Sequence, residues 1–294
     1  MGDFIPSTYS LVLVLTDYSL IVIRLQVDIY KICFLNHDLR LWHDVCVIAQ
    51  PNVGELHANL VDALGAGIVS GDLAPGQVLN LDGVSAEHGV SRSVAREAIR
   101  VLESMGMVAS RRRVGITIQP AVKWNMFDPR LIRWRLGAGD RAAQLESLSE
   151  LRRGFEPVAA ALAARRADPH QCRIMAAAVS DMVVHGRSGD LESYLLADKI
   201  FHRTLLEASG NEMFRALTDV VAEVLSGRTH HGMMPERPNT AAIALHDEVA
   251  RAIRLQDEVA AEKAMRAIID EAAAAVTEEF CGAEQSASSP PSDD

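Results

Sequence analysis

The chain has 294 residues, 49% of them hydrophobic, and a formal net charge of −10 at pH 7. This length allows two domains of ordinary size, and the apolar fraction is large enough for a real core. The acidic balance argues against a protein that coats nucleic acid non-specifically, although a local basic surface is still compatible with it. The four cysteines are far apart in the sequence, which argues against a disulfide framework or a cysteine zinc site and favours a reducing, cytoplasmic location.

Residues 1–53 differ in composition from the rest, with three of the four tyrosines of the chain and a single alanine. The apolar run 11–25 contains Asp17 and Arg24, so it falls short of the ~20 apolar residues that span a bilayer. No basic segment precedes it, which argues against a secretory signal. We therefore expect an atypical extension outside the fold. A misassigned start is a further hypothesis, although no methionine lies between Met1 and Met105.

Residues 54–120 contain helix starts, helix ends and turns in the order expected of a winged helix-turn-helix. Leucine or isoleucine recurs every four residues from Leu56 to Ile68, which predicts a helix that ends at Gly71. A turn at Pro75–Gly76 and a short helix over 82–88 follow. Ser91 stands at an N-cap position, and the next helix runs to about residue 105. Residues 107–120 then alternate like two short strands joined by a tight turn.

Positive charge is concentrated at the end of this module. Residues 91–119 contain six arginines and two glutamates, in a chain with 29 basic and 39 acidic residues. Arginine is suited to hold guanine O6 and N7 together, and short hydroxyls suit phosphates or bases. A solvated amphipathic helix beside a basic loop is the alternative. The predicted inner stripe of the second long helix consists of Val94, Ala98, Val101, Leu102 and Met105.

The stretch "GVSRSVAREAIRVLESMGMV" resembles the recognition-helix signature of the GntR family of bacterial transcription regulators. The resemblance covers residues 55–119 and implies contacts between DNA and the start of this helix and the wing. One departure concerns the start of the preceding helix, where family members often carry an arginine and this chain has Asp82. The residues implied in DNA contact are Ser91, Arg92, Ser93, Arg96, Arg112, Arg113 and Gly115.

Residues 121–140 are expected to be a linker, residues 141–280 an all-helical effector-binding domain, and residues 281–294, rich in proline and serine, a disordered tail. Helices are expected near 146–167, 170–186, 190–208, 212–226, 240–255 and 258–278. Pro157 predicts a kink or a break in the first of them. The expected fold is therefore mainly α: a winged helix-turn-helix followed by an all-α bundle.

Asp198 and His202 are four residues apart, so they share one face of a helix, and His246 lies on a later helix. Carboxylate and imidazole groups suit Zn, Mn or Ni. A core or surface histidine is the commoner explanation for such a pair.

Residues 148–278 resemble the FadR-type (FCD) domain of GntR regulators, through "LSELRRGFEP", "DKIFH" and "LHDEVARAI". The resemblance implies metal ligation by Asp198, His202 and His246. The fourth family ligand, a histidine, is replaced by Ile268, so a metal with three protein ligands and a site with no metal both remain open. A closer resemblance to sugar-acid regulators implies that Arg152 pairs with an effector carboxylate and that His230 contacts the effector. An ordinary surface salt bridge is the alternative for Arg152.

These features together predict a homodimeric, cytoplasmic transcription regulator of the repressor type. It would bind double-stranded operator DNA, respond to a small carboxylate such as a sugar acid, and have no membrane partner and no enzymatic activity. The alternative is a metal-dependent hydrolase with a fused DNA-binding head. The sequence shows no evident general base near the three ligands and no HExxH motif or nucleophile elbow.

Overall fold

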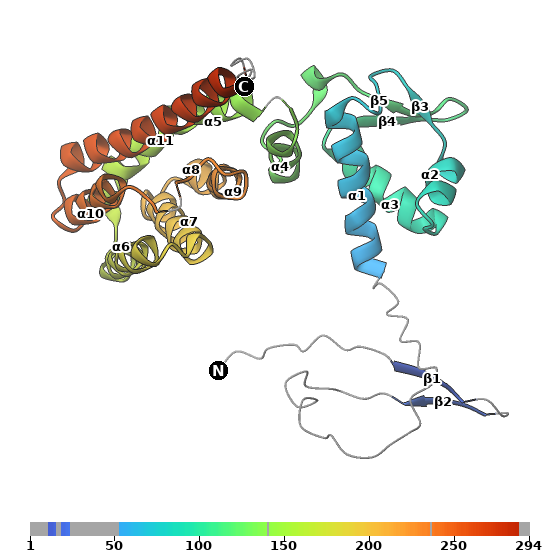
Figure 1. Cartoon of the computed structure of the whole chain (residues 1–294), viewed down its shortest axis with the longest axis horizontal. Coiled ribbons are helices and arrows are strands. Elements are labelled where there is room, and N and C mark those ends of the chain that lie inside the picture. Colours follow the sequence, from blue (N-terminus) through green and yellow to red (C-terminus); the bar gives the residue numbers. More distant parts are fainter. Residues whose placement is uncertain (1–10, 16–18, 24–52, 140, 236, 288–294) are drawn as a thin grey trace, which may run out of the picture. The chain divides into compact units, whose positions relative to one another are not determined.

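The computed structural model describes residues 11–15, 19–23, 53–139, 141–235 and 237–287 (Figure 1). The chain divides into two compact units, Met1–Leu56 and His57–Asp294. In the first unit, strand β1 (Leu11–Leu15) pairs antiparallel with β2 (Ser19–Ile23). The other residues of the expected N-terminal extension, up to residue 52, lie outside the described residues.

Helix α1 (Val53–Ser70) starts in the last residues of the first unit and continues into the second, where α2 (Leu81–Glu87) and α3 (Arg92–Ser104) follow. Helix α1 buries Leu60, Leu64 and Ile68, which belong to the predicted stripe. Side chains cap the next two helices: the Asn80 amide oxygen accepts from the Gly83 N–H, and the Ser91 hydroxyl accepts from the Val94 N–H. Such caps satisfy backbone donors that have no partner within the helix.

The buried face of α3 differs from the predicted stripe. Ala95, Ala98, Ile99 and Leu102 are buried within the helix, whereas the predicted Val94 and Val101 are only partly buried. The buried face is therefore rotated slightly from the predicted one. The side of α3 that carries its three arginines stays exposed, as the step of four residues predicted.

A three-stranded sheet completes this module, in the order β3-β5-β4. Strands β4 (Val108–Arg111) and β5 (Gly115–Ile118) form the predicted hairpin. The sequence did not predict β3 (Val78–Leu79), which pairs antiparallel with β5. Two residues are too few for an alternating pattern, so this strand owes its existence to its pairing with the hairpin.

The expected linker contains regular structure. A 3₁₀ turn (Ala121–Lys123) precedes helix α4 (Pro129–Gly137), which has Asp128 as its N-cap and proline in its first turn. Leu131 and Trp134 join the hydrophobic core of the winged module. Ile132 and Leu136 belong instead to a cluster with α5 and α9 residues. The two faces of α4 therefore pack in two different cores.

The remaining helices form the predicted all-α bundle, and the mainly α fold class is confirmed. Helix α5 lies alongside α11 (Figure 1), and α6, α7 and α10 bury the large shared core. Helix α5 runs through Pro157 without the predicted break, although this proline leaves one carbonyl of the preceding turn without its helical donor. The helices are α5 (Arg141–Arg166), α6 (Pro169–Ser188), α7 (Leu191–Ala208), α8 (Glu212–Arg215), α9 (Thr218–His230), α10 (Thr240–Arg254) and α11 (Glu258–Ala287).

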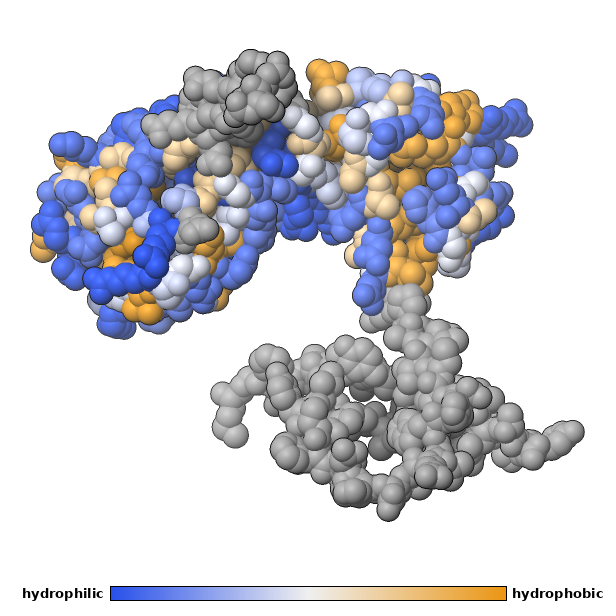
Figure 2. Space-filling view, in the orientation of Figure 1, coloured by the Kyte–Doolittle hydropathy of each residue, from blue (hydrophilic) through white to orange (hydrophobic). Residues whose placement is uncertain are grey.

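Helix α11 continues to Ala287, past residue 281 where a disordered tail was expected, and residues 288–294 lie outside the described residues. The space-filling view shows hydrophilic side chains interspersed with apolar ones over the visible face of the bundle (Figure 2). Among the helices that the structure describes, none combines the length and the apolar character that a membrane crossing requires.

Candidate functional site

The first candidate surface lies at the start of α3. The Ser91 hydroxyl caps the helix and lies 2.9 Å from the Ser93 hydroxyl. The Arg92 Nε lies 2.9 Å from the Asp82 Oδ1, and both side chains are largely exposed. Arg96 is exposed one turn further along the helix. The residues implied in DNA contact at this helix start are thus all exposed, and Asp82 forms an ion pair with one of them.

The turn of the wing carries Arg112 and Arg113, both exposed. Arg113 has a φ of 68°, in the left-handed region. Gly115 has a φ of 113°, and a Cβ atom there would lie 2.8 Å from the Leu79 carbonyl oxygen on β3. Glycine at 115 is therefore required by the backbone of the sheet, whether or not this residue also approaches DNA.

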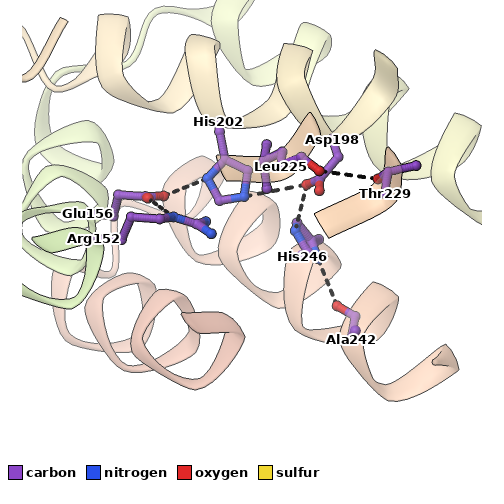
Figure 3. Close-up of polar contacts among 8 residues, drawn as sticks. All are labelled: Arg152, Glu156, Asp198, His202, Leu225, Thr229, Ala242 and His246. Atoms are coloured by element: carbon purple, nitrogen blue, oxygen red, sulfur yellow. Dashed lines mark hydrogen bonds and ion pairs between the residues drawn. The ribbon is translucent and has the colours of Figure 1, made fainter. Parts of the chain in front are cut away.

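The second candidate site joins Asp198 and His202 on α7 to His246 on α10 (Figure 3). One ligand atom from each of the three residues lies within 4.8 Å of the others, and all three residues are buried. The Asp198 Oδ1 lies 3.4 Å from the His202 Nε2 and 3.2 Å from the His246 Nε2. The structure thus brings together all three residues of the predicted metal set.

Hydrogen bonds on the far side of each ring orient the two imidazoles. The His202 Nδ1 lies 2.6 Å from the Glu156 Oε2, and the His246 Nδ1 lies 2.7 Å from the Ala242 carbonyl oxygen. A carbonyl only accepts, so His246 donates through Nδ1, and Nε2 is the ring nitrogen left to face Asp198 or a metal. Both Nε2 atoms and the Asp198 Oδ1 are buried and have no hydrogen-bond partner among the described residues. This arrangement is typical of metal-ligating histidines and their supporting groups, so the three residues fit a divalent cation.

Glu156 connects this cluster to Arg152, one turn earlier on α5. The Arg152 Nε donates to the Glu156 Oε1 at 2.5 Å, and the two side chains are 2% and 0% exposed. The surface salt bridge considered for Arg152 is therefore wrong. Burial alone would raise the pKa of Glu156, but the charges of Arg152 and His202 outweigh burial and lower the pKa to about 2. Sequence reasoning missed Glu156, because a glutamate four residues after an arginine is also common on solvated helix faces.

The charges of the cluster also act on His202. Burial lowers its pKa, but the carboxylates of Glu156 and Asp198 outweigh burial and raise the pKa to about 9. Without a metal, a second proton therefore resides on this ring at neutral pH. A cation bound at Nε2 would replace that proton.

A cavity of about 210 Å³ opens over the cluster. Arg152, the three predicted metal ligands and Ile268, at the fourth family position, all line it. Apolar and small polar residues line the rest, together with two charged side chains that were not predicted to line the effector site. Those two are Arg228 and Glu271.

His230 is not among the residues that line this cavity. Its side chain is 50% exposed, and its Nε2 lies 3.1 Å from Glu192. Residues 228 and 230 are about 200° apart around a helix axis. Because α9 turns Arg228 toward the cavity, it turns His230 away, and the prediction of His230 as an effector contact is not supported by its position.

Comparison with known proteins agrees with this division of the chain. Residues 56–118 match the family of bacterial regulatory proteins called the gntR family, and residues 147–271 match the FCD domain. The galactonate operon transcriptional repressor of Escherichia coli is 28% identical over 214 residues, which cover 71% of this chain and 92% of the repressor. The regulator LutR of Bacillus subtilis is 29% identical over 161 residues, 54% of this chain and 70% of the relative.

A solved structure described as Streptococcus agalactiae GntR aligns with a TM-score of 0.41 and 27% identity, covering 74% of this chain and 98% of that chain. The sequence matches place a GntR-type head before an FCD domain, in the order in which the structure has a winged module before a helical bundle. The chain therefore belongs to the GntR family of bacterial regulatory proteins, in the FadR-type group with an FCD domain, and is a transcriptional regulator of that type.

Proposed function

We propose that this regulator is a homodimeric repressor whose affinity for operator DNA depends on a small carboxylate, of the sugar-acid class, bound in its helical domain. The proposal rests on the presence of two features in one chain. An exposed arginine surface on α3 and the wing accompanies a buried cavity over three convergent metal ligands.

The DNA half of the proposal rests on exposure and charge. Residues at the start of a recognition helix reach base edges in the major groove, and two heads of a dimer match two half-sites. Ser91, Ser93, Arg92 and Arg96 are all exposed at that helix start. Arg112 and Arg113 are exposed at the wing, where they can contact the backbone or the minor groove. Binding of this kind falls steeply with salt.

The effector half rests on the metal ligands and the arginine beside them. A divalent Zn, Mn or Ni ion held by Asp198, His202 and His246 would supply a cationic anchor with open positions for a carboxylate. Arg152 uses its Nε for Glu156, and Figure 3 shows its two terminal nitrogens pointing away from that carboxylate. A guanidinium in this state can hold a ligand carboxylate in a fork.

Control of DNA binding follows if the effector binds more tightly to the arrangement that cannot engage the operator. A ligand shifts such an equilibrium only by its difference in affinity between the two states. No chemistry on the ligand is required. The name of the Escherichia coli relative, a repressor of the galactonate operon, supports sugar acids as the first class to test.

The test is calorimetric titration of D-galactonate and related acids into metal-loaded protein and into protein stripped with EDTA. We expect binding to the loaded protein alone, followed by release of operator DNA in a gel-shift assay. Analysis of the acids after incubation distinguishes the alternative hydrolase, because a regulator returns them unchanged. Equal binding to stripped protein would remove the metal from the proposal, and turnover would replace the regulator with an enzyme.

A further inference from the structure

Arg228 on α9 is a cavity residue that the proposed function does not use. It lines the cavity with Arg152 and the three metal ligands. Its Nε atom is buried and has no hydrogen-bond partner among the described residues. The residue as a whole is half-buried, a guanidinium stays charged in proteins, and burying one of its donors without an acceptor is costly. An anion in the cavity would therefore be stabilised by this side chain.

The neighbouring charges do not supply that anion. Glu156 is bonded to Arg152 and to His202, and the Asp198 oxygen lies between two imidazoles. Glu271 also lines the cavity, but no ion pair joins it to Arg228 among the described residues. Burial and the repulsion of Arg152 lower the pKa of Arg228, while Asp198, Glu271 and Tyr194 act in the opposite direction. Arg228 is thus a cation in the cavity wall that a ligand anion could bind.

One carboxylate does not have enough oxygens for all the cationic groups in the cavity. In the proposed function, a first carboxylate would use its two oxygens at the open positions of the metal and at the terminal nitrogens of Arg152. Arg228 then faces the remainder of the ligand. The cavity, about 210 Å³, lies below the ~300–1,000 Å³ of typical drug-sized sites. The buried Tyr194 and the exposed Asn239 in its lining add polar groups for hydroxyls.

We propose that Arg228 is a second anion-binding residue and that the effector is a small polyhydroxy acid with two anionic groups. The first carboxylate would lie at the metal and Arg152, and the second group at Arg228. This inference rests on the proposed function for the first carboxylate. The second group is a carboxylate or a phosphate, and the experiment distinguishes the two.

The test compares D-galactonate with galactarate, which differ only in the oxidation of the terminal carbon to a second carboxylate. A second arm compares gluconate with 6-phosphogluconate. We expect calorimetry on metal-loaded protein to give binding of at least one dianion tighter than that of its monoacid by about tenfold or more. Whichever dianion shows the larger preference identifies the second group.

The variant Arg228→Gln should abolish this preference. Dianion binding should fall by about tenfold or more, whereas monoacid binding should change by less than about threefold. Arg228→Lys, which keeps the charge but not the fork, should retain part of the preference. Arg215→Gln, an exposed position on α8, is the matched control and should bind like the wild type.

A stability measurement keeps the proposal falsifiable if binding by the variant is hard to interpret. Removing a cation whose buried Nε has no acceptor should raise the unfolding temperature of ligand-free Arg228→Gln by ~2 °C or more. A lower unfolding temperature would show that Arg228 already has a stabilising counter-charge and would overturn the proposal.

Different results would exclude the second anionic group and the sugar-acid effector. If dianions and monoacids bind wild-type protein equally, or if Arg228→Gln weakens both equally, this inference is wrong and the carboxylate effector stands. If none of these acids binds the metal-loaded protein, the sugar-acid effector of the proposed function fails together with it.

Discussion

The Nδ1 of His202 lies 2.6 Å from the Oε2 of Glu156, and the Glu156 side chain is 0% exposed. The second oxygen of that carboxylate accepts from Arg152. A single buried glutamate thus orients a predicted metal ligand and a predicted effector contact together. Loss of either partner would leave a buried charge uncompensated.

We predict that Glu156→Gln weakens metal binding by about 10–100-fold, because supporting carboxylates fix the orientation and the basicity of a ligating histidine. Competition with a fluorescent zinc chelator measures this affinity. Glu150→Gln, at an exposed position on the same helix, should bind metal like the wild type. Equal affinities of the two variants would show that Glu156 only supports the fold.

Removal of the metal should lower the thermal stability. A metal at 100 times its dissociation constant stabilises the folded state by ~2.7 kcal/mol, which corresponds to ~5–10 °C for a domain of this size. Differential scanning calorimetry with EDTA, followed by readdition of zinc, checks this. His246→Ala should lose the response to zinc, and His170→Ala, at an exposed position, should keep it. An unchanged response in His246→Ala would argue against the three-ligand site.

Asp82 should weaken binding to DNA. Its carboxylate pairs with Arg92 at 2.9 Å, and both side chains are at least 65% exposed, so the pair itself is worth only ~0–1 kcal/mol. Asp82→Asn frees Arg92 and removes a negative charge from the surface proposed to meet phosphate. We expect about two- to fivefold tighter binding in fluorescence anisotropy at low salt.

The control for Asp82 is Asp247→Asn, which changes the net charge equally on α10, an element of the helical bundle. This variant should bind DNA like the wild type. Tighter binding by both variants would indicate a general charge effect, and no change in either would place Asp82 away from the DNA.

Gly115→Ala should destabilise the winged module by ~1–3 kcal/mol. The φ of 113° is strained for alanine, and the added Cβ would lie 2.8 Å from the Leu79 oxygen. Urea denaturation of the full chain measures the loss, and Gly139→Ala, which meets nothing within 4 Å, should cost far less. A variant that is as stable as the wild type but fails to bind DNA would instead assign Gly115 to the DNA contact alone.

The local signals of the sequence predicted elements better than they predicted the polar site. The N-cap at Ser91 and the spacing of Asp198 and His202 are local features, and the structure has each where the pattern indicated. Strand β3 has two residues and depends on its pairing with β5, so no local pattern predicted it. Helix α4 does carry a local start signal, Asp128 followed by Pro129, which the expectation of a linker overlooked.

The site residues that the sequence did not predict are charged groups, and they are buried only because helices distant in the chain pack together. Glu156 becomes buried because α5 packs against α7, and its bond to His202 spans 46 residues. The sequence predicted His230 rather than Arg228 as an effector contact, because it does not show which side of α9 lines the cavity. The rotation of α9 about its axis determines which of Arg228 and His230 lines the cavity.

Selection from a random library of DNA duplexes tests whether the exposed arginines of α3 read an operator. We expect wild-type protein to enrich a palindromic sequence with two half-sites. Arg92→Ala and Arg96→Ala should each lose that sequence while keeping the wild-type unfolding temperature. Failure of the wild type to enrich any sequence, or enrichment by both variants equal to that of the wild type, would show that these arginines do not read an operator.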